Sequence, residues 1–138
     1  MKPGQWLRAY VPALLVLVVA DYLWLGTVMV DFYHQRMGDL LLPLPRLVPA
    51  VLFYLMYIAG VCWFVLRPAL FLRSSLKQVA LQAALFGVVA YGTYDLSNYA
   101  TLRVWSLDLT LADMTWGGFI SALAALAGFV AARRRPVR

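Results

Sequence analysis

Long apolar segments alternate with short polar connections along the chain. The apolar segments cover roughly residues 6–30, 47–66, 76–100 and 111–132. Each comes close to the ~20 residues that an α-helix needs to cross ~30 Å of hydrocarbon. Because these segments take up nearly the whole chain, they leave no room for a separate soluble domain. The pattern predicts an all-α fold with a single domain over residues 1–138, a bundle of four transmembrane helices.

Prolines indicate where the second helix begins and ends. Pro43, Pro45 and Pro49 precede or open its apolar segment, and Pro68 follows it. Proline lacks a backbone N–H, so it fits the first turn of a helix but disrupts the interior. We therefore expect the second helix to end before Pro68, and we expect Pro12 to bend the first helix.

Composition supports a membrane protein and excludes several other classes. The chain is 64% hydrophobic and only 13% charged, and its mean hydropathy is +0.78, which a water-soluble globule would not tolerate. The net charge of +6 is gathered at segment ends and in connections, as in membrane flanks, so we do not expect nucleic acid as a partner. The single cysteine, Cys62, excludes an internal disulfide and any multi-cysteine metal site.

The basic residues are distributed unequally between the two predicted sides of the membrane. The side with both termini and the second connection holds Lys2, Arg8, Arg67, Arg73, Lys77, Arg133, Arg134, Arg135 and Arg138. The other side holds only Arg36, Arg46 and Arg103. Because basic residues favour the cytoplasmic side, we expect both termini to be cytoplasmic in a multi-pass protein of a bacterial inner membrane.

The start of the chain also has a second interpretation. Lys2 and Arg8 precede a short apolar run that ends in small residues at Ala20, as in a signal peptide. The run does not stop there but continues to Val30, which gives it the length of a full span. A first transmembrane helix is therefore the favoured interpretation.

Three aspartates lie within or beside the apolar segments. At ~1.5 Å of rise per residue, Asp21 lies ~22 Å along the first helix and Asp95 lies ~27 Å along the third. Asp113 opens the fourth helix, which runs back from the outer side. All three should reach a similar depth in the outer half of the bilayer. Since ionisable groups within a membrane are costly, these residues are candidates for a binding or proton-handling site.

Polar and aromatic residues share helix faces with these aspartates. On the third helix, Tyr91, Asp95 and Asn98 are spaced i, i+4 and i+7, and Tyr94 is a further neighbour of Asn98. The other candidates are Trp24 beside Asp21 on the first helix, Tyr54 and Tyr57 on the second, and Trp116 beside Asp113 on the fourth. Together these faces predict a pocket that leans toward the outer side.

These residues also have structural interpretations. Hydrogen bonds between membrane helices contribute ~0.6 kcal/mol on average without any further function. Asp113 stands where an aspartate would cap the fourth helix, with Asp108 and Thr110 as competing caps, so a cap and a pocket residue both remain open. Asp95 follows a long helical run and has no cap to make, which makes it the stronger functional candidate.

Small residues occupy one face of the third and of the fourth helix. They are Ala83, Ala84 and Gly87 on the third helix, and Gly117, Gly118, Ser121, Ala122, Ala125 and Gly128 on the fourth. Small residues allow the backbones of membrane helices to approach closely. We therefore predict that these two helices pack against each other.

Several common chemistries are disfavoured. The chain has one histidine, His34, which we expect at the outer interface, and it has no glutamate. It lacks a zinc-binding HExxH motif, a phosphate-binding glycine loop with lysine and a nucleophile elbow. We predict no cofactor and no zinc site.

Several of these motifs resemble one known family. They are Tyr91-Gly92-Thr93-Tyr94-Asp95-Leu96-Ser97-Asn98 followed by Ala100, Leu102, Trp105, Asp113 and Trp116-Gly117, together with Asp21, Trp24-Leu25, Tyr33, Gly38, Phe53-Tyr54, Tyr57, Gly60 and Pro68. The chain resembles, over nearly its whole length, the bacterial membrane family DUF2177, which often has threonine in place of Ser97. The resemblance implies a membrane protein with four helices and names no substrate.

Three functions remain open. The favoured one is binding or transport of a small polar or cationic ligand or of a proton, with a homodimer as the transporting unit. The second is a membrane enzyme that acts on a lipid or isoprenoid, with Asp95 or Asp21 as general base or as part of a metal site with Asn98 and Asp113. Three carboxylates and an amide oxygen would suit Mg²⁺ or Ca²⁺. The third is an accessory subunit in which the aspartates only join helices.

Overall fold

The computed structural model describes residues 1–133, and every regular element in this range is helical. The elements are α1 (Pro3–Leu23), the π-helix η1 (Trp24–Val28), α2 (Val30–Met37), the 3-10 helix η2 (Gly38–Leu40), α3 (Leu47–Gly60), the π-helix η3 (Val61–Leu66), α4 (Arg67–Phe71), α5 (Leu76–Thr101) and α6 (Leu107–Arg133). Of the basic residues counted above, Arg134, Arg135 and Arg138 lie outside the described range.

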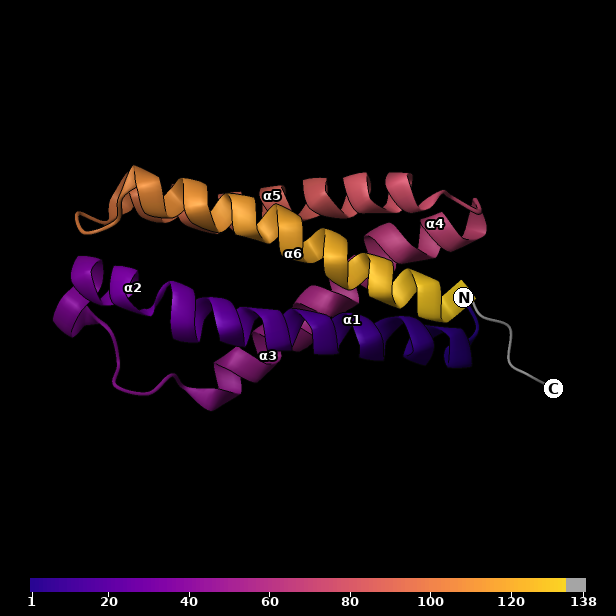
Figure 1. The fold of residues 1–138 in the computed structure, drawn as a ribbon, viewed down its shortest axis with the longest axis horizontal. Helices are drawn as coiled ribbons and strands as arrows, with labels where there is room; N and C mark the ends of the chain where they lie inside the picture. The colour runs from indigo at the N-terminus through magenta and orange to yellow at the C-terminus, as the bar shows by residue number, and fades with distance from the viewer. Residues whose placement is uncertain (134–138) are drawn as a thin grey trace.

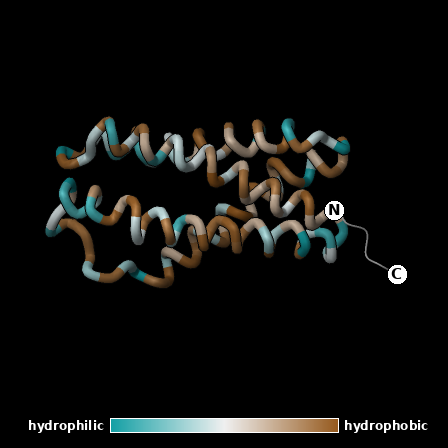
Figure 2. Tube along the Cα trace, viewed as in Figure 1, coloured by the Kyte–Doolittle hydropathy of each residue, from teal (hydrophilic) through white to brown (hydrophobic). Residues whose placement is uncertain are grey.

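The predicted four spans are confirmed. Continuous helical segments long and apolar enough to cross a membrane cover Pro3–Val28, Leu47–Phe71, Leu76–Thr101 and Leu107–Arg133. Hydrophobic residues run along most of their length, and hydrophilic residues gather toward the two ends of the bundle (Figure 2). Many large apolar side chains on their outer surfaces are exposed, as expected of helices that face lipid. The protein is thus a membrane protein that sits in a lipid bilayer.

Helix α6 lies between α1 and α5 and carries much of the buried core (Figure 1). Glycines in α5 and α6 permit this close position. A Cβ added at Gly87 of α5 would collide with the Gly117 carbonyl and the Ser121 hydroxyl of α6, and one at Gly128 would collide with the Ala9 carbonyl of α1. The predicted close packing of the third and fourth helices is confirmed, and α6 packs as closely on the first.

The first span ends in a different way from the prediction. A π-helical turn over Trp24–Val28 closes the span, and a separate short helix, α2, follows from Val30 to Met37. Gly38 then adopts a positive φ of 49°, which reverses the chain. Residue 30 is therefore the start of α2 rather than the end of the first span, and Tyr33 and His34 belong to α2.

The expectation that Pro68 ends the second helix is wrong. The helix passes through a π-helical segment, η3, and continues as α4 to Phe71 with Pro68 in its first turn. Proline in a helix lacks one backbone donor and its ring crowds the carbonyl four residues earlier. The wider π-helical turn immediately before α4 relieves this conflict, because there the backbone pairs over five residues instead of four.

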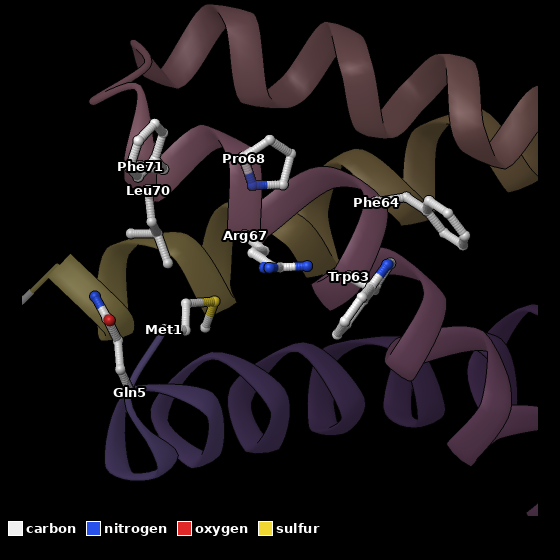
Figure 3. Close-up of a pocket in the computed structure, with 8 residues that line it drawn as sticks. All are labelled: Met1, Gln5, Trp63, Phe64, Arg67, Pro68, Leu70 and Phe71. Atoms are coloured by element: carbon white, nitrogen blue, oxygen red, sulfur yellow. The ribbon is translucent and has the colours of Figure 1, made fainter.

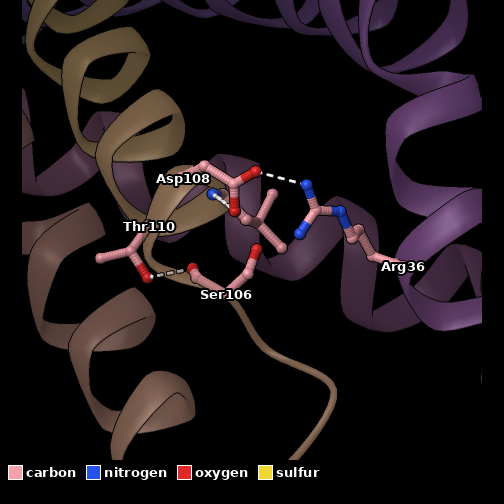
Figure 4. Close-up of polar contacts among 5 residues, drawn as sticks. Arg36, Ser106, Asp108 and Thr110 are labelled. Carbon is pink, nitrogen blue, oxygen red and sulfur yellow. Dashed lines mark hydrogen bonds and ion pairs between the residues drawn. The ribbon is translucent and has the colours of Figure 1, made fainter.

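The capping interpretation of Asp113 is also wrong. Helix α6 begins at Leu107, four residues before the predicted start, so Asp113 lies in the second turn. Asp108 occupies the first turn and accepts a hydrogen bond from the Leu109 amide at 3.1 Å. The Thr110 hydroxyl donates back to the Ser106 carbonyl at 3.0 Å (Figure 4). Free of a capping role, the Asp113 side chain is available to the interior.

Candidate functional site

A cavity of about 520 Å³ lies among α1, η1, α2, α3, α5 and α6, toward the end of the bundle where α2 is found. It is lined by Asp21, Trp24, Leu25, Tyr33, Phe53, Tyr57, Ala90, Tyr91, Tyr94, Asp95, Asp113 and Trp116. Its volume falls in the range of small-molecule sites. Three carboxyl groups and several aromatic rings therefore converge on one space within the membrane-spanning region.

Asp21 is held by donors from two other helices. Its side chain is 3% exposed, and its Oδ1 accepts a hydrogen bond from Trp116 Nε1 at 2.7 Å. Its Oδ2 accepts from the Tyr54 hydroxyl at 3.0 Å. One donor on each oxygen satisfies much of what a buried carboxylate requires. Asp21 thus joins α1 to α3 and α6 and forms a fixed wall of the cavity.

Asp113 is joined to the short helix α2. The Tyr33 hydroxyl donates a hydrogen bond to Asp113 Oδ2. Burial raises the pKa of Tyr33 above its ordinary value, and the negative charge of Asp113 raises it further. The phenol therefore keeps its proton and remains a donor throughout the physiological pH range. This bond holds α2 against α6 at the edge of the cavity.

Two further contacts fix α2 in this position. Arg36 forms an ion pair with Asp108 in the first turn of α6 (Figure 4). In addition, Met29, Trp105 and Leu109 form a small buried cluster, on which Phe32 and Tyr33 pack. The polar contact is largely exposed and contributes little by itself, so the apolar cluster is the main support of α2.

Asp95 differs from the other two carboxyl groups. Its side chain is 0% exposed, yet neither Oδ1 nor Oδ2 accepts a hydrogen bond from an N–H or hydroxyl group of the residues that the structure describes. The Asp113 carboxyl group is near enough to act on Asp95 electrostatically and, when one of the two carries a proton, to share a hydrogen bond with it. A buried carboxylate without a donor costs several kcal/mol in a low-dielectric interior. Asp95 is therefore an acceptor in the cavity wall whose polar contact among the described residues is a second carboxyl group, so that an ionised Asp95 has no N–H or hydroxyl donor there.

Aromatic rings form much of the remaining wall. Trp24 and Trp116 are stacked, with ring centroids 4.4 Å apart and planes 3° apart. Tyr57 and Tyr91 meet edge to face at 5.9 Å, and the Tyr57 hydroxyl is bonded to Ser121 Oγ at 2.6 Å. Such rings present negatively polarised faces and shield the carboxyl groups from lipid.

The electrostatic character of the cavity is acidic. No lysine, arginine or histidine is among the residues that line it. The Trp24 indole N–H is buried and makes no hydrogen bond of ordinary geometry within residues 1–133, although it lies near enough to Asp113 to act on that carboxyl group. The lining thus offers carboxylate oxygens and aromatic faces without a fixed positive charge.

The sequence also matches a family model described as a predicted membrane protein, DUF2177, over residues 6–130. The chain belongs to the DUF2177 family. No curated protein and no solved structure matches it. The function of this DUF2177 protein is therefore inferred from its own residues.

Most of the candidate residues of this DUF2177 protein meet at the cavity. Those that line it are Asp21, Trp24, Tyr57, Tyr91, Tyr94, Asp95, Asp113 and Trp116. Tyr54 does not line it but bonds to Asp21. Asn98 is not among the lining residues; its backbone carbonyl accepts from the Leu102 amide at 2.7 Å, where α5 ends.

The cavity also contains residues outside the predicted set. Leu25, Phe53 and Ala90 are apolar and carry no signal that separates them from lipid-facing neighbours. Tyr33 reaches the site only because α2 packs against α6. In the sequence, the one indication that Tyr33 matters is that it belongs, with Gly38, to the residues that resemble the family.

The carboxyl groups do not form a metal site in the described part of the chain. Residues 1–133 contain no group of three or more histidine, cysteine, aspartate or glutamate side chains arranged to hold a metal ion. Asn98 is also absent from the cavity lining. An arrangement of Asp21, Asp95, Asn98 and Asp113 around Mg²⁺ or Ca²⁺ is therefore not supported among the described residues.

Proposed function

We propose that this protein binds a small organic cation carrying N–H groups, such as a protonated primary amine, in the acidic and aromatic cavity. The observation that carries the proposal is the state of Asp95, whose two buried carboxyl oxygens have no N–H or hydroxyl donor among the described residues and lie beside a second carboxyl group, Asp113. Asp21 and Asp113, in the same cavity, each accept bonds from the protein. A ligand with its own N–H groups would supply the donors that Asp95 lacks.

The rest of the lining favours the same class of ligand. Trp24 and Trp116 contribute large aromatic surfaces, and tryptophan is the side chain that attracts cations most strongly through its ring face. An anion would meet three carboxyl groups and no basic side chain among the lining residues. A cation would meet favourable charge in a low-dielectric space, where electrostatic interactions are strong.

The proposed orientation places this cavity in the outer half of a bacterial inner membrane. At the opposite end of the bundle, the start of α1, the α4–α5 connection and the end of α6 carry basic residues and no aspartate within residues 1–133. The basic residues at the α2 end are accompanied by Asp31, Asp39 and Asp108. This asymmetry supports cytoplasmic termini. In that orientation the cavity would be exposed to ligands from outside the cell.

Transport of the same cation is a further step of the proposal. The cavity lies toward one end of the bundle, and four helices in one chain enclose a small volume. A transport route through the protein would require a second chain, so we propose a homodimer as the transporting unit. Ligand binding in the cavity is the part that the observed geometry supports best.

The proposal is tested by comparing the affinities of ligands of different charge for the purified protein in detergent. Calorimetric titration would compare n-butylammonium with tetramethylammonium, 1-butanol and butyrate, which have related size but differ in charge and in N–H groups. We expect n-butylammonium to bind at least tenfold more tightly than the neutral alcohol and the anion. Tetramethylammonium should bind more weakly than n-butylammonium because it brings no donor to Asp95. Equal affinity for butyrate, or no binding by a folded protein, would favour the accessory-subunit interpretation instead.

A further inference from the structure

A second cavity lies at the opposite end of the bundle from the acidic one. It has a volume of about 690 Å³ and is lined by Met1, Gln5, Trp63, Phe64, Arg67, Pro68, Leu70 and Phe71. These residues come from the start of the chain and from η3 and α4, so the cavity lies where the second span ends (Figure 3). Gln5 also approaches the Ala132 carbonyl at 3.5 Å, which places the end of α6 nearby.

Arg67 is the one charged side chain that lines this second cavity. Its guanidinium carbon lies 4.3 Å from the centroid of the Trp63 ring, a cation–π contact that positions the group. Figure 3 shows the Arg67 side chain extending into the space between α1 and α4, with Met1 and Gln5 on the other side. Within residues 1–133 the only salt bridge pairs Arg36 with Asp108 at the far end. Arg67 therefore faces the cavity without a carboxylate partner among the described residues.

The walls around Arg67 are those of a lipid-facing site. Trp63 and Phe64 are exposed large apolar residues in η3, and Phe71 at the end of α4 is 86% exposed. These side chains belong to a membrane-spanning segment that ends at Phe71. An aromatic residue beside an arginine at the end of a span is the arrangement expected where hydrocarbon meets headgroups. Lipid phosphate groups occupy that level.

The charge of this end of the bundle selects among lipids. The described basic residues here are Lys2, Arg8, Arg67, Arg73, Lys77 and Arg133. No aspartate is found at this end within residues 1–133. A zwitterionic headgroup would place its ammonium group where no carboxylate can meet it, whereas an anionic headgroup meets positive charge throughout. Basic clusters beside membrane spans attract anionic lipids for this reason.

We propose that this cavity binds the phosphate group of an anionic phospholipid, with the Arg67 guanidinium as its principal ligand and the exposed aromatic residues against the acyl chains. Arginine suits this role because its planar guanidinium can donate two parallel hydrogen bonds to phosphate oxygens. Trp63 fixes the plane of the guanidinium from behind. The site is separate from the acidic cavity and does not depend on the ligand proposed there.

The test is native mass spectrometry of the delipidated full chain in detergent, with phosphatidylglycerol or phosphatidylcholine of the same acyl chains added back. We expect the parent chain to retain phosphatidylglycerol at a several-fold lower lipid concentration than phosphatidylcholine. The Arg67→Gln variant should need at least fivefold more phosphatidylglycerol for the same occupancy and should lose the preference between the two lipids. The affinity of Arg67→Lys for phosphatidylglycerol should fall between those of the parent and Arg67→Gln, because lysine keeps the charge and loses the planar donor pair.

Arg73→Gln is the matched control, because Arg73 lies in the connection after α4 and does not line the cavity. It should bind phosphatidylglycerol as the parent does. Equal losses in Arg67→Gln and Arg73→Gln would overturn the site and leave only a general attraction of the basic end. Equal retention of the two lipids by the parent would overturn the selectivity. If Arg67→Gln does not fold, the comparison of Arg67→Lys with the parent and with Arg73→Gln decides in the same way.

Discussion

Trp24 and Trp116 lie in nearly parallel stacked planes, 3° apart, although they are separated by most of the chain. The contact joins the π-helical end of the first span to the middle of α6. Trp116 also donates its indole N–H to Asp21. Trp116 therefore forms part of the wall of the acidic cavity and also orients the Asp21 carboxyl group.

Replacing the Trp116 donor tests the state of Asp21. The Trp116→Phe variant keeps an aromatic ring against Trp24 but removes the bond to Asp21 Oδ1. We expect a loss of about 1–3 kcal/mol in the free energy of unfolding, since the buried carboxylate then keeps only the Tyr54 donor. Reversible unfolding in mixed micelles measures the change. Trp6→Phe is the control, because the Trp6 side chain stacks on Trp63 and makes no hydrogen bond within residues 1–133. A loss as large in that variant would show that the indole bond is not the cause.

Close packing of α5 on α6 predicts a large effect of a single methyl group. In Gly87→Ala the new Cβ would collide with the backbone carbonyl of Gly117 and with Ser121. Because neither can retreat far, we expect destabilisation of about 1–3 kcal/mol. Gly26→Ala in η1 meets nothing within 4 Å and should be close to neutral. Thermal unfolding of both variants in the same detergent compares them, and equal unfolding temperatures would contradict the packing.

The raised pKa of Tyr33 predicts a dependence of stability on alkaline pH. The folded state holds the Tyr33 proton more firmly than the unfolded state, whose tyrosines titrate near pH 10. The stabilisation by Tyr33 is therefore complete below about pH 10 and is lost progressively as the pH rises above it. The difference in unfolding free energy between the parent and Tyr33→Phe should shrink over that range. A difference that stays constant from pH 8 to 11 would show that Tyr33 is not buried against Asp113.

The proposed orientation predicts which loops react with a membrane-impermeant maleimide in intact cells. Cys62 is buried, so it gives little background. Asp39→Cys, at the α2 end, should label from outside the cell. Arg73→Cys, in the connection between α4 and α5, should label only after the membrane is permeabilised. The reverse pattern would place the termini outside and the acidic cavity in the cytoplasmic half.

The sequence was sufficient for the four spans and for much of the cavity lining. Hydropathy over ~20 residues identifies a span because the bilayer sets its length. Helical spacing brought Tyr91 and Asp95 to one wall, and depth along the helices brought Asp21 to the same level. Both inferences follow from helix geometry alone. The small-residue faces of α5 and α6 were likewise visible in the pattern.

Features that depend on helix ends were not predictable in the same way. The early start of α6 moved Asp113 from a capping position into the second turn, and the π-helical segment before Pro68 let the second helix continue. Tyr33 entered the site because a short helix after η1 packs on Trp105 and Leu109. Asn98 shares the stripe of Tyr91 and Asp95 but lies nearer the end of α5 than the cavity extends. The ends of these helices depend on tertiary contacts, which cannot be inferred from the hydropathy of the sequence.

If Asp95 accepts hydrogen bonds from a cationic ligand, replacing this one carboxyl group should remove ligand binding. Native mass spectrometry would measure binding of n-butylammonium to the parent, to Asp95→Asn and to Asp39→Asn, which makes the same change at an exposed aspartate outside the cavity. A hydrogen bond to a charged group contributes about 1.5–3 kcal/mol, so Asp95→Asn should weaken binding roughly tenfold or more. We expect one bound amine per chain in the parent and in Asp39→Asn, and little in Asp95→Asn. Equal binding by all three folded proteins would contradict this role of Asp95.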